Sequence, residues 1–173
     1  GAMTPRHEAI PSEGGHTSFA PQNPHQLALL NALWEHQRRV EIEHVLSGPG
    51  LERLYRANAQ LQGRAAQLAA PAITAAAMQG DTFALAVMQD FFDILAAFAS
   101  DTAVLMGAVD GVYIVGDMMT KLRSINDIAR LRECFDDKEN YRAYCSRIPL
   151  ALVTAQDTGL RGCWRYLELD ASN

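Results

Sequence analysis

The feature that most constrains the fold is a long apolar stretch between Asp81 and Gly107. Its hydrophobic side chains recur at helical spacing, at Phe83, Val87, Phe91, Ile94, Leu95, Phe98 and Leu105. Asp81 can cap the first turn of such a helix, and Gly107 can end the last one. Because several aspartates interrupt the stretch, it is not typical of a membrane span. The sequence therefore predicts a long core helix against which the other elements pack.

Length and composition predict a single globular domain. Of the 173 residues, 49% are hydrophobic and 20% are charged, as is ordinary for a chain that buries a core. The net charge of -5 comes without a basic cluster, because the only lysines are Lys121 and Lys138. A nucleic-acid partner needs positive charge to neutralise its phosphates, so we expect no such partner and no membrane partner.

The three cysteines, Cys134, Cys145 and Cys163, are odd in number and have no Cys-x-x-Cys spacing. They are expected to be free thiols in a reducing cytoplasm. His7, His25, His36 and His44 have no metal-ligand spacing with carboxylates or cysteines, so we expect no metal site. Residues 1–3 are typical of what tag removal leaves behind, and the domain is taken as residues 4–173.

The rest of the chain predicts helices interspersed with short strands. Strands are expected at residues 17–20, 112–115 and 150–154. Helices are expected at residues 23–39, from 51 onward, and at 63–78, 125–135, 139–145 and 158–167. Gly159 and Gly162 in the last helix indicate close approach by a neighbouring element. The predicted class is a helix-rich α/β domain with a small sheet.

A small polar cluster is predicted at Glu13-Gly14-Gly15-His16. The carboxylate only accepts hydrogen bonds, whereas the imidazole both donates and accepts. The two glycines let the backbone come close to whatever is bound. Such a set suits a polyhydroxylated ligand, although the motif alone also fits a plain turn with solvated polar residues.

Taken in order with several later motifs, this stretch resembles the large C-terminal domain of bacterial ATP-dependent glucokinase. The later motifs lie at residues 43–55, 110–116, 135–138, 148–149 and 158–162. The resemblance covers nearly the whole chain and rests on the ordered set. Residues 40–46 alternate like a strand, but the resemblance favours a short helix there.

The resemblance implies a partial actin-like, ribonuclease-H-related domain that lacks the N-terminal kinase domain. An incomplete sheet with an exposed edge and an unfilled cleft would follow. The residues that match Glu13, His16 and Glu43 line the sugar site in that family, so these three are the predicted glucose-binding residues. The family's catalytic base and phosphate loops lie upstream of the Glu-Gly-Gly-His motif, and no catalytic residue is predicted in this chain.

The nucleotide side departs from the family pattern. After the strand that matches residues 112–115, the family has a glycine pair beside the adenosine, whereas this chain has Gly116 and Asp117. The glycine pair before that strand is Asp110-Gly111 here, and a further family glycine is Glu139. These changes fit either a working loop that has drifted or an impaired nucleotide site. Asn126-Asp127 resembles the family's catalytic pair, but its position favours a helix cap.

Two functions compete on this evidence. In the first, the parent protein is a cytoplasmic glucokinase that uses ATP and Mg²⁺, and this fragment alone is inactive and holds neither cofactor. In the second, it is a non-catalytic sugar-sensing or protein-interaction module derived from a glucokinase. The expected partners are glucose and the missing N-terminal domain, with a homodimer as a further candidate.

Overall fold

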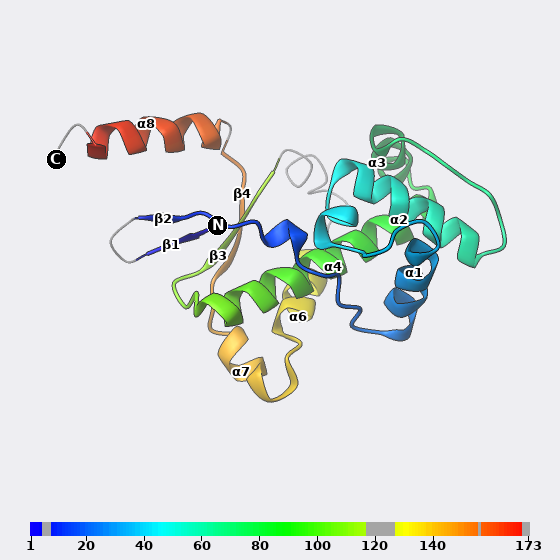
Figure 1. Cartoon of the computed structure of the whole chain (residues 1–173), viewed down its shortest axis with the longest axis horizontal. Helices are drawn as coiled ribbons and strands as arrows, with labels where there is room; N and C mark the ends of the chain where they lie inside the picture. The colour runs from blue at the N-terminus through cyan, green and yellow to red at the C-terminus, as the bar shows by residue number, and fades with distance from the viewer. Residues whose placement is uncertain (5–7, 117–126, 156, 171–173) are drawn as a thin grey trace.

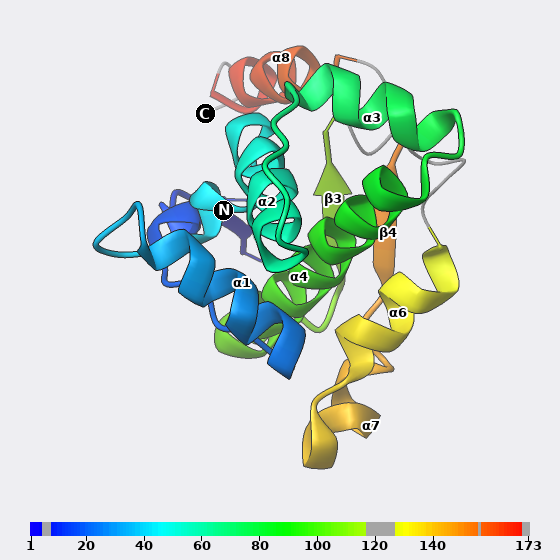
Figure 2. The ribbon, with the colours of Figure 1, turned by 90° about the vertical axis from the view of Figure 1, so that its right-hand side faces the viewer.

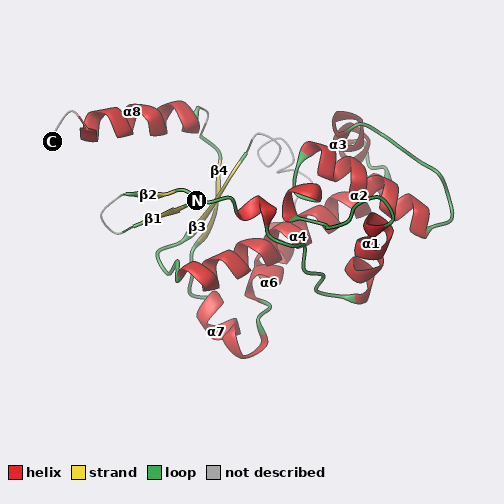
Figure 3. Ribbon diagram, viewed as in Figure 1, coloured by secondary structure: helices red, strands yellow, loops and turns green. Residues whose placement is uncertain are grey.

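The computed structural model describes residues 1–4, 8–116, 127–155 and 157–170. Helices dominate it, and the strands are few and short (Figure 3). This arrangement confirms the predicted helix-rich α/β class with a small sheet. All three cysteines are free thiols, as predicted.

Helix α4, Thr82–Met106, is the centre of the fold. The side chain of Asp81 accepts a hydrogen bond from the Ala84 backbone N–H at 2.7 Å, and Gly107 ends the helix with φ of 61°. Both predicted ends are confirmed. By length and composition α4 is apolar enough to cross a membrane, but 56% of its most apolar window is buried inside the fold. It is the core helix.

Other helices surround α4 (Figures 1 and 2). Those that contact it are α2 (Gly48–Leu61), α3 (Ala70–Met78), α6 (Ile128–Asp136) and the short α7 (Arg142–Cys145), while α1 (Pro24–Trp34) packs on α2. Side-chain caps begin three of them, because Asn23, Ser47 and Asp127 accept from the N–H groups of Gln26, Gly50 and Arg130. The prediction that Asp127 serves as a helix cap is therefore confirmed.

Within the described ranges the strands form two sheets of two strands each. Strand β3 (Val112–Val115) pairs in parallel with β4 (Leu150–Val153), and β1 (Ala2–Met3) pairs antiparallel with β2 (Ala9–Ile10). Val112 and Ile114 pack against the core, whereas Tyr113 and Val115 are exposed. One face of β3 is thus packed and the other is an open apolar face.

The final helix, α8 (Thr158–Asp170), stands apart from the helical body at the end of β4 (Figure 1). Its large apolar side chains are exposed, namely Leu160, Trp164, Tyr166 and Leu167. A Cβ added at Gly159 or Gly162 would meet nothing within 4 Å. The prediction that these glycines mark close approach by a neighbour is therefore wrong within this chain.

Several predicted boundaries are also wrong, for identifiable reasons. The first helix stops at Trp34, because the polar residues that follow offer no apolar face to bury. The alanine-rich helix begins only at Ala70, because Pro71 belongs in a first turn and disfavours helix before it. The expected strand at residues 17–20 is a single bridge between Ser18 and Glu41, since the partner segment turns directly afterwards.

Two further expectations need correction. The predicted helix at residues 139–145 is a 3₁₀ turn, Glu139–Tyr141, followed by the single-turn α7. Leu105 was predicted to face the core, but it is 82% exposed near the end of α4. In the last turn of the helix Ala103 is buried and Leu105 faces the other way, toward solvent.

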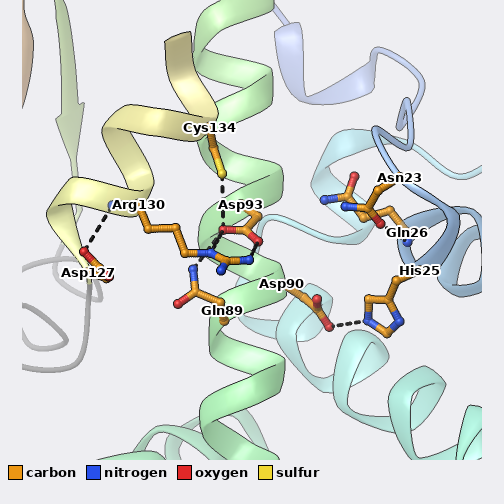
Figure 4. Close-up of polar contacts among 9 residues, drawn as sticks. All are labelled: Asn23, His25, Gln26, Gln89, Asp90, Asp93, Asp127, Arg130 and Cys134. Atoms are coloured by element: carbon orange, nitrogen blue, oxygen red, sulfur yellow. Dashed lines mark hydrogen bonds and ion pairs between the residues drawn. The ribbon is translucent and has the colours of Figure 1, made fainter. Parts of the chain in front are cut away.

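A polar cluster ties α6 to α4 (Figure 4). The mostly buried carboxylate of Asp93 accepts from Arg130 Nε at 3.0 Å and Nη2 at 2.7 Å, and from Gln89 at 2.8 Å. Cys134 Sγ lies 3.5 Å from the same carboxylate, and burial raises the pKa of its thiol to about 11. Since each member is satisfied and the thiol stays protonated, we assign this cluster to stability.

Candidate functional site

Two motifs that lie far apart in the sequence meet at one corner of the molecule. The 3₁₀ turn η1, Gly14–His16, lies against a second 3₁₀ turn, η2, Ile42–His44. Backbone hydrogen bonds hold the two segments together: Phe19 N–H donates to the Val40 carbonyl, and Ile42 N–H donates to the Thr17 carbonyl, each at 2.9 Å. Segment 40–46 therefore contains the expected short helical turn, but of the 3₁₀ kind.

This pairing places the predicted sugar residues side by side. His16 Nε2 lies 3.9 Å from Glu43 Oε2, and the Glu13 carbonyl accepts from the His16 backbone N–H at 3.0 Å. The side chains of His16 and Glu43 are 59% and 61% exposed. The fold thus brings His16 and Glu43 together, with Glu13 three residues before His16, and leaves all three exposed.

The structure adds a residue that the sequence reasoning missed. Glu41 Oε2 lies 2.7 Å from His16 Nδ1 and accepts the proton of that nitrogen, because a carboxylate has no donor. The available signal was a second acid, two residues before Glu43. The two carboxylates therefore lie on either side of the His16 ring, one near each nitrogen.

The contact between His16 and Glu41 shifts the pKa values of the two groups in opposite directions. The hydrogen bond that His16 donates to Glu41 raises the pKa of His16 above its ordinary value of 6.5, with smaller contributions from the charges of Glu43 and Glu13. The same bond lowers the pKa of Glu41 below 4.5. The histidine contribution to stability is full below its ordinary pKa and is lost as pH rises through the raised one. The Glu41 contribution is full above its ordinary pKa and is lost as pH falls through the lowered one.

Packing within the chain does not require glycine at Gly14 or Gly15. A Cβ at Gly14 would lie 3.5 Å from Phe98, and one at Gly15 would lie 3.5 Å from Glu43 Cβ, both ordinary contact distances. Neither glycine has a positive φ. The small size of Gly14 and Gly15 therefore leaves room beside Glu43 and Phe98 that this chain does not fill.

A groove of about 510 Å³ runs between the N-terminal segment and α4. Gly14 and Gly15 form part of its wall, and Ile94, Phe98, Leu105 and Met106 supply an apolar side. Glu13, His16 and Glu43 are not in this wall. Because sugar hydroxyls need polar partners, the polar corner formed by Glu13, His16, Glu41 and Glu43 suits a sugar better than the apolar groove does.

The predicted nucleotide side is only partly described. Gly116 is exposed directly after β3, while Asp117 and Asn126 lie outside the described residues. Glu139, at a position where the family has glycine, has φ of 42°. That left-handed conformation favours glycine and costs another residue on the order of 1 kcal/mol. This chain therefore holds an acid in a backbone conformation that favours glycine.

Among the residues with a described placement, no group of three or more His, Cys, Asp or Glu side chains is arranged to hold a metal ion. We therefore assign no metal to this corner.

Comparison with known proteins gives a consistent result. A family model described as Glucokinase matches residues 2–169. The glucokinase of Chromohalobacter salexigens is 40% identical over 91% of this chain and 50% of its own length. The chain thus spans about half of that relative.

Solved structures agree with this comparison. A glucokinase from an Antarctic psychrotroph has a TM-score of 0.82 and 33% identity, over 89% of this chain and 49% of its own. A glucokinase from Balamuthia mandrillaris, solved in complex with glucose, has a TM-score of 0.67 over 82% of this chain and 42% of its own. Its identity of 21% makes it a likeness of fold.

Proposed function

Because the chain belongs to the glucokinase family, we propose that it is the C-terminal, sugar-binding half of a cytoplasmic ATP-dependent glucokinase. The observation that carries this proposal is the polar corner. His16 and Glu43 come from separate segments, lie 3.9 Å apart at their nearest polar atoms, and are both open to solvent. The adjoining glycines leave space that the chain itself does not use.

The chemistry of this corner suits a sugar. A hydroxyl group is both a donor and an acceptor, so it can donate to a carboxylate and accept from an imidazolium at the same time. Hydrogen bonds to charged groups are stronger than neutral ones, and a ligand that lacks the hydroxyl leaves those groups unpaired. Glu13, His16 and Glu43 therefore bind glucose and select it over molecules without hydroxyls at these positions.

The remaining parts of the reaction belong to the other half of the parent protein. Phosphoryl transfer needs ATP, Mg²⁺ and a general base held in line with the sugar hydroxyl. The described residues offer no metal set for Mg²⁺, and Gly116 alone is not a nucleotide site. This chain contributes sugar binding and orientation, and the apolar groove, the open face of β3 and α8 are covered by the absent half.

Replacement of Glu43 by alanine in the full-length protein tests the sugar site. We expect glucose affinity to fall about tenfold or more, because charge-assisted hydrogen bonds to the sugar are lost. Thermal stability is expected to be unchanged, since Glu43 is exposed and outside the core. Calorimetric titration with glucose measures the effect, and Glu35→Ala, which removes an exposed carboxylate bonded to Gln60, is the control. An unchanged glucose affinity in the Glu43 variant would contradict the proposal.

The isolated 173-residue chain is expected to transfer no phosphate. The groups that clamp the γ-phosphate and its magnesium are assigned to the absent half, so positioning of the reactants is lost. A coupled assay of glucose-dependent ADP release measures this, with the full-length protein as the positive control. ADP release above background by the purified chain would show that the proposed assignment of phosphoryl transfer to the other half is wrong. Titration of the full-length protein with ATP separates a kinase from a sugar sensor.

A further inference from the structure

We propose that Glu41 is a positioning residue that fixes the orientation and tautomer of His16, so that Nε2 of the ring is presented to a sugar hydroxyl. The sugar-binding part of this inference rests on the proposed function. The contact between Glu41 and His16 does not depend on that function. Glu41 was not among the residues that the family resemblance assigned to the sugar.

Glu41 is itself held firmly. Its backbone N–H donates to His44 Nδ1 at 3.1 Å, and its side chain accepts from the His44 backbone N–H. The bridge to Ser18 fixes its backbone against the segment that carries His16. The Glu41 side chain is 22% exposed, against 59% for His16. A partly buried, doubly anchored carboxylate is suited to orient a more exposed ring.

The hydrogen bond of 2.7 Å between His16 Nδ1 and Glu41 Oε2 determines which ring nitrogen is left to contact a ligand. Because Glu41 can only accept, Nδ1 of His16 carries a proton and donates it, and Nε2 points to the ligand side. Nε2 lies 3.9 Å from Glu43 Oε2, too far for a direct hydrogen bond. One hydroxyl oxygen at about 2.8 Å from both atoms fits between them.

Below the raised pKa of His16 both ring nitrogens carry protons, and above it the contact with Glu41 keeps the remaining proton on Nδ1. The imidazolium donates from Nε2 to the hydroxyl oxygen, and the hydroxyl donates its own proton to Glu43. The charged groups that act on His16 are Glu13, Glu41 and Glu43, and those that act on Glu41 are His16, His44 and Arg39. The three acidic groups around the ring favour the imidazolium, so sugar affinity should decrease as pH rises through the His16 titration.

The test is Glu41→Gln, which keeps the length of the side chain and an oxygen that can accept from His44. In the 173-residue chain, nitrogen-15 NMR is expected to show Nδ1 of His16 protonated and a titration midpoint above 6.5 in the unsubstituted protein. In the variant the midpoint of His16 should fall, because the amide that replaces the Glu41 carboxylate carries no charge. The melting temperature should change little.

The second measurement is glucose affinity against pH in the full-length protein. We expect the variant to bind glucose about tenfold more weakly at neutral pH, with the decline in affinity moved to lower pH. A purely structural role for Glu41 would weaken binding equally at all pH values. Glu41→Asp, which keeps the charge, should recover part of the affinity.

The outcomes separate the two proposals. An unchanged His16 midpoint in Glu41→Gln would overturn the positioning role, and so would a shifted midpoint with an unchanged affinity profile. If the unsubstituted full-length protein bound no glucose, the proposed function would fail and the sugar-positioning role with it. The NMR midpoints would then still decide whether Glu41 controls His16.

Discussion

Replacement of Gly50 by alanine is expected to destabilise the chain by about 3 kcal/mol, at the upper end of what overpacking costs. A Cβ at Gly50 would lie 2.6 Å from the carbonyl carbon of Val45 and 2.7 Å from its oxygen. These are backbone atoms of a residue that is 0% exposed, so they have no free direction in which to move. Either the start of α2 shifts or the turn before it does.

Gly48→Ala is the matched control, because Gly48 lies in the same first turn of α2 and an added Cβ there meets nothing within 4 Å. We expect its stability to be unchanged or higher by about 0.5 kcal/mol, since alanine restricts the unfolded chain. Urea denaturation of both variants measures the difference. Equal midpoints would mean that the corner between η2 and α2 is not tightly packed.

The Gly50→Ala substitution also has a functional consequence. Val45 directly follows η2, the turn that carries Glu43, and η2 also contains His44, which anchors Glu41. A shift at Gly50 is therefore transmitted to the polar corner through a few residues. In the full-length protein, Gly50→Ala should weaken glucose binding, whereas Gly48→Ala should not.

The parts of the fold that the sequence predicted well are those set by local chemistry. The cap at Asp81, the left-handed stop at Gly107 and strand β3 all depend on residues that act within a few positions. The poorly predicted parts depend on distant contacts. Whether Leu105 faces the core is decided by what packs over the end of α4, and helical spacing alone cannot say.

The candidate site shows the same division. The prediction of a sugar site at Glu13, His16 and Glu43 came from residue types and motif order, and the structure brings His16 and Glu43 within 3.9 Å of each other. Glu41 was missed because its role depends on pairing residue 18 with residue 41, a long-range contact.

The largest loss of stability is expected from Phe92→Ala, at about 4 kcal/mol. Phe92 is 1% exposed near the middle of α4, and its ring packs edge-on against Phe91 with centroids 6.0 Å apart. Removing the ring leaves a cavity in the core beside α4. This helix contacts α2, α3, α6 and α7. Since whole domains are stable by about 5–15 kcal/mol, this loss should lower the urea denaturation midpoint by a large fraction of its value.

Leu105→Ala, on the same helix, is the control, and in the isolated chain it should change stability by less than about 0.5 kcal/mol. Leu105 is 82% exposed, so its truncation removes little buried surface. In the full-length protein the proposed second half covers the groove that Leu105 lines, and the same substitution should then cost about 2 kcal/mol. Denaturant titrations of both variants in both chains measure this difference. A Leu105 effect that stays small in the full-length protein would contradict the proposal that the absent half packs over the end of α4.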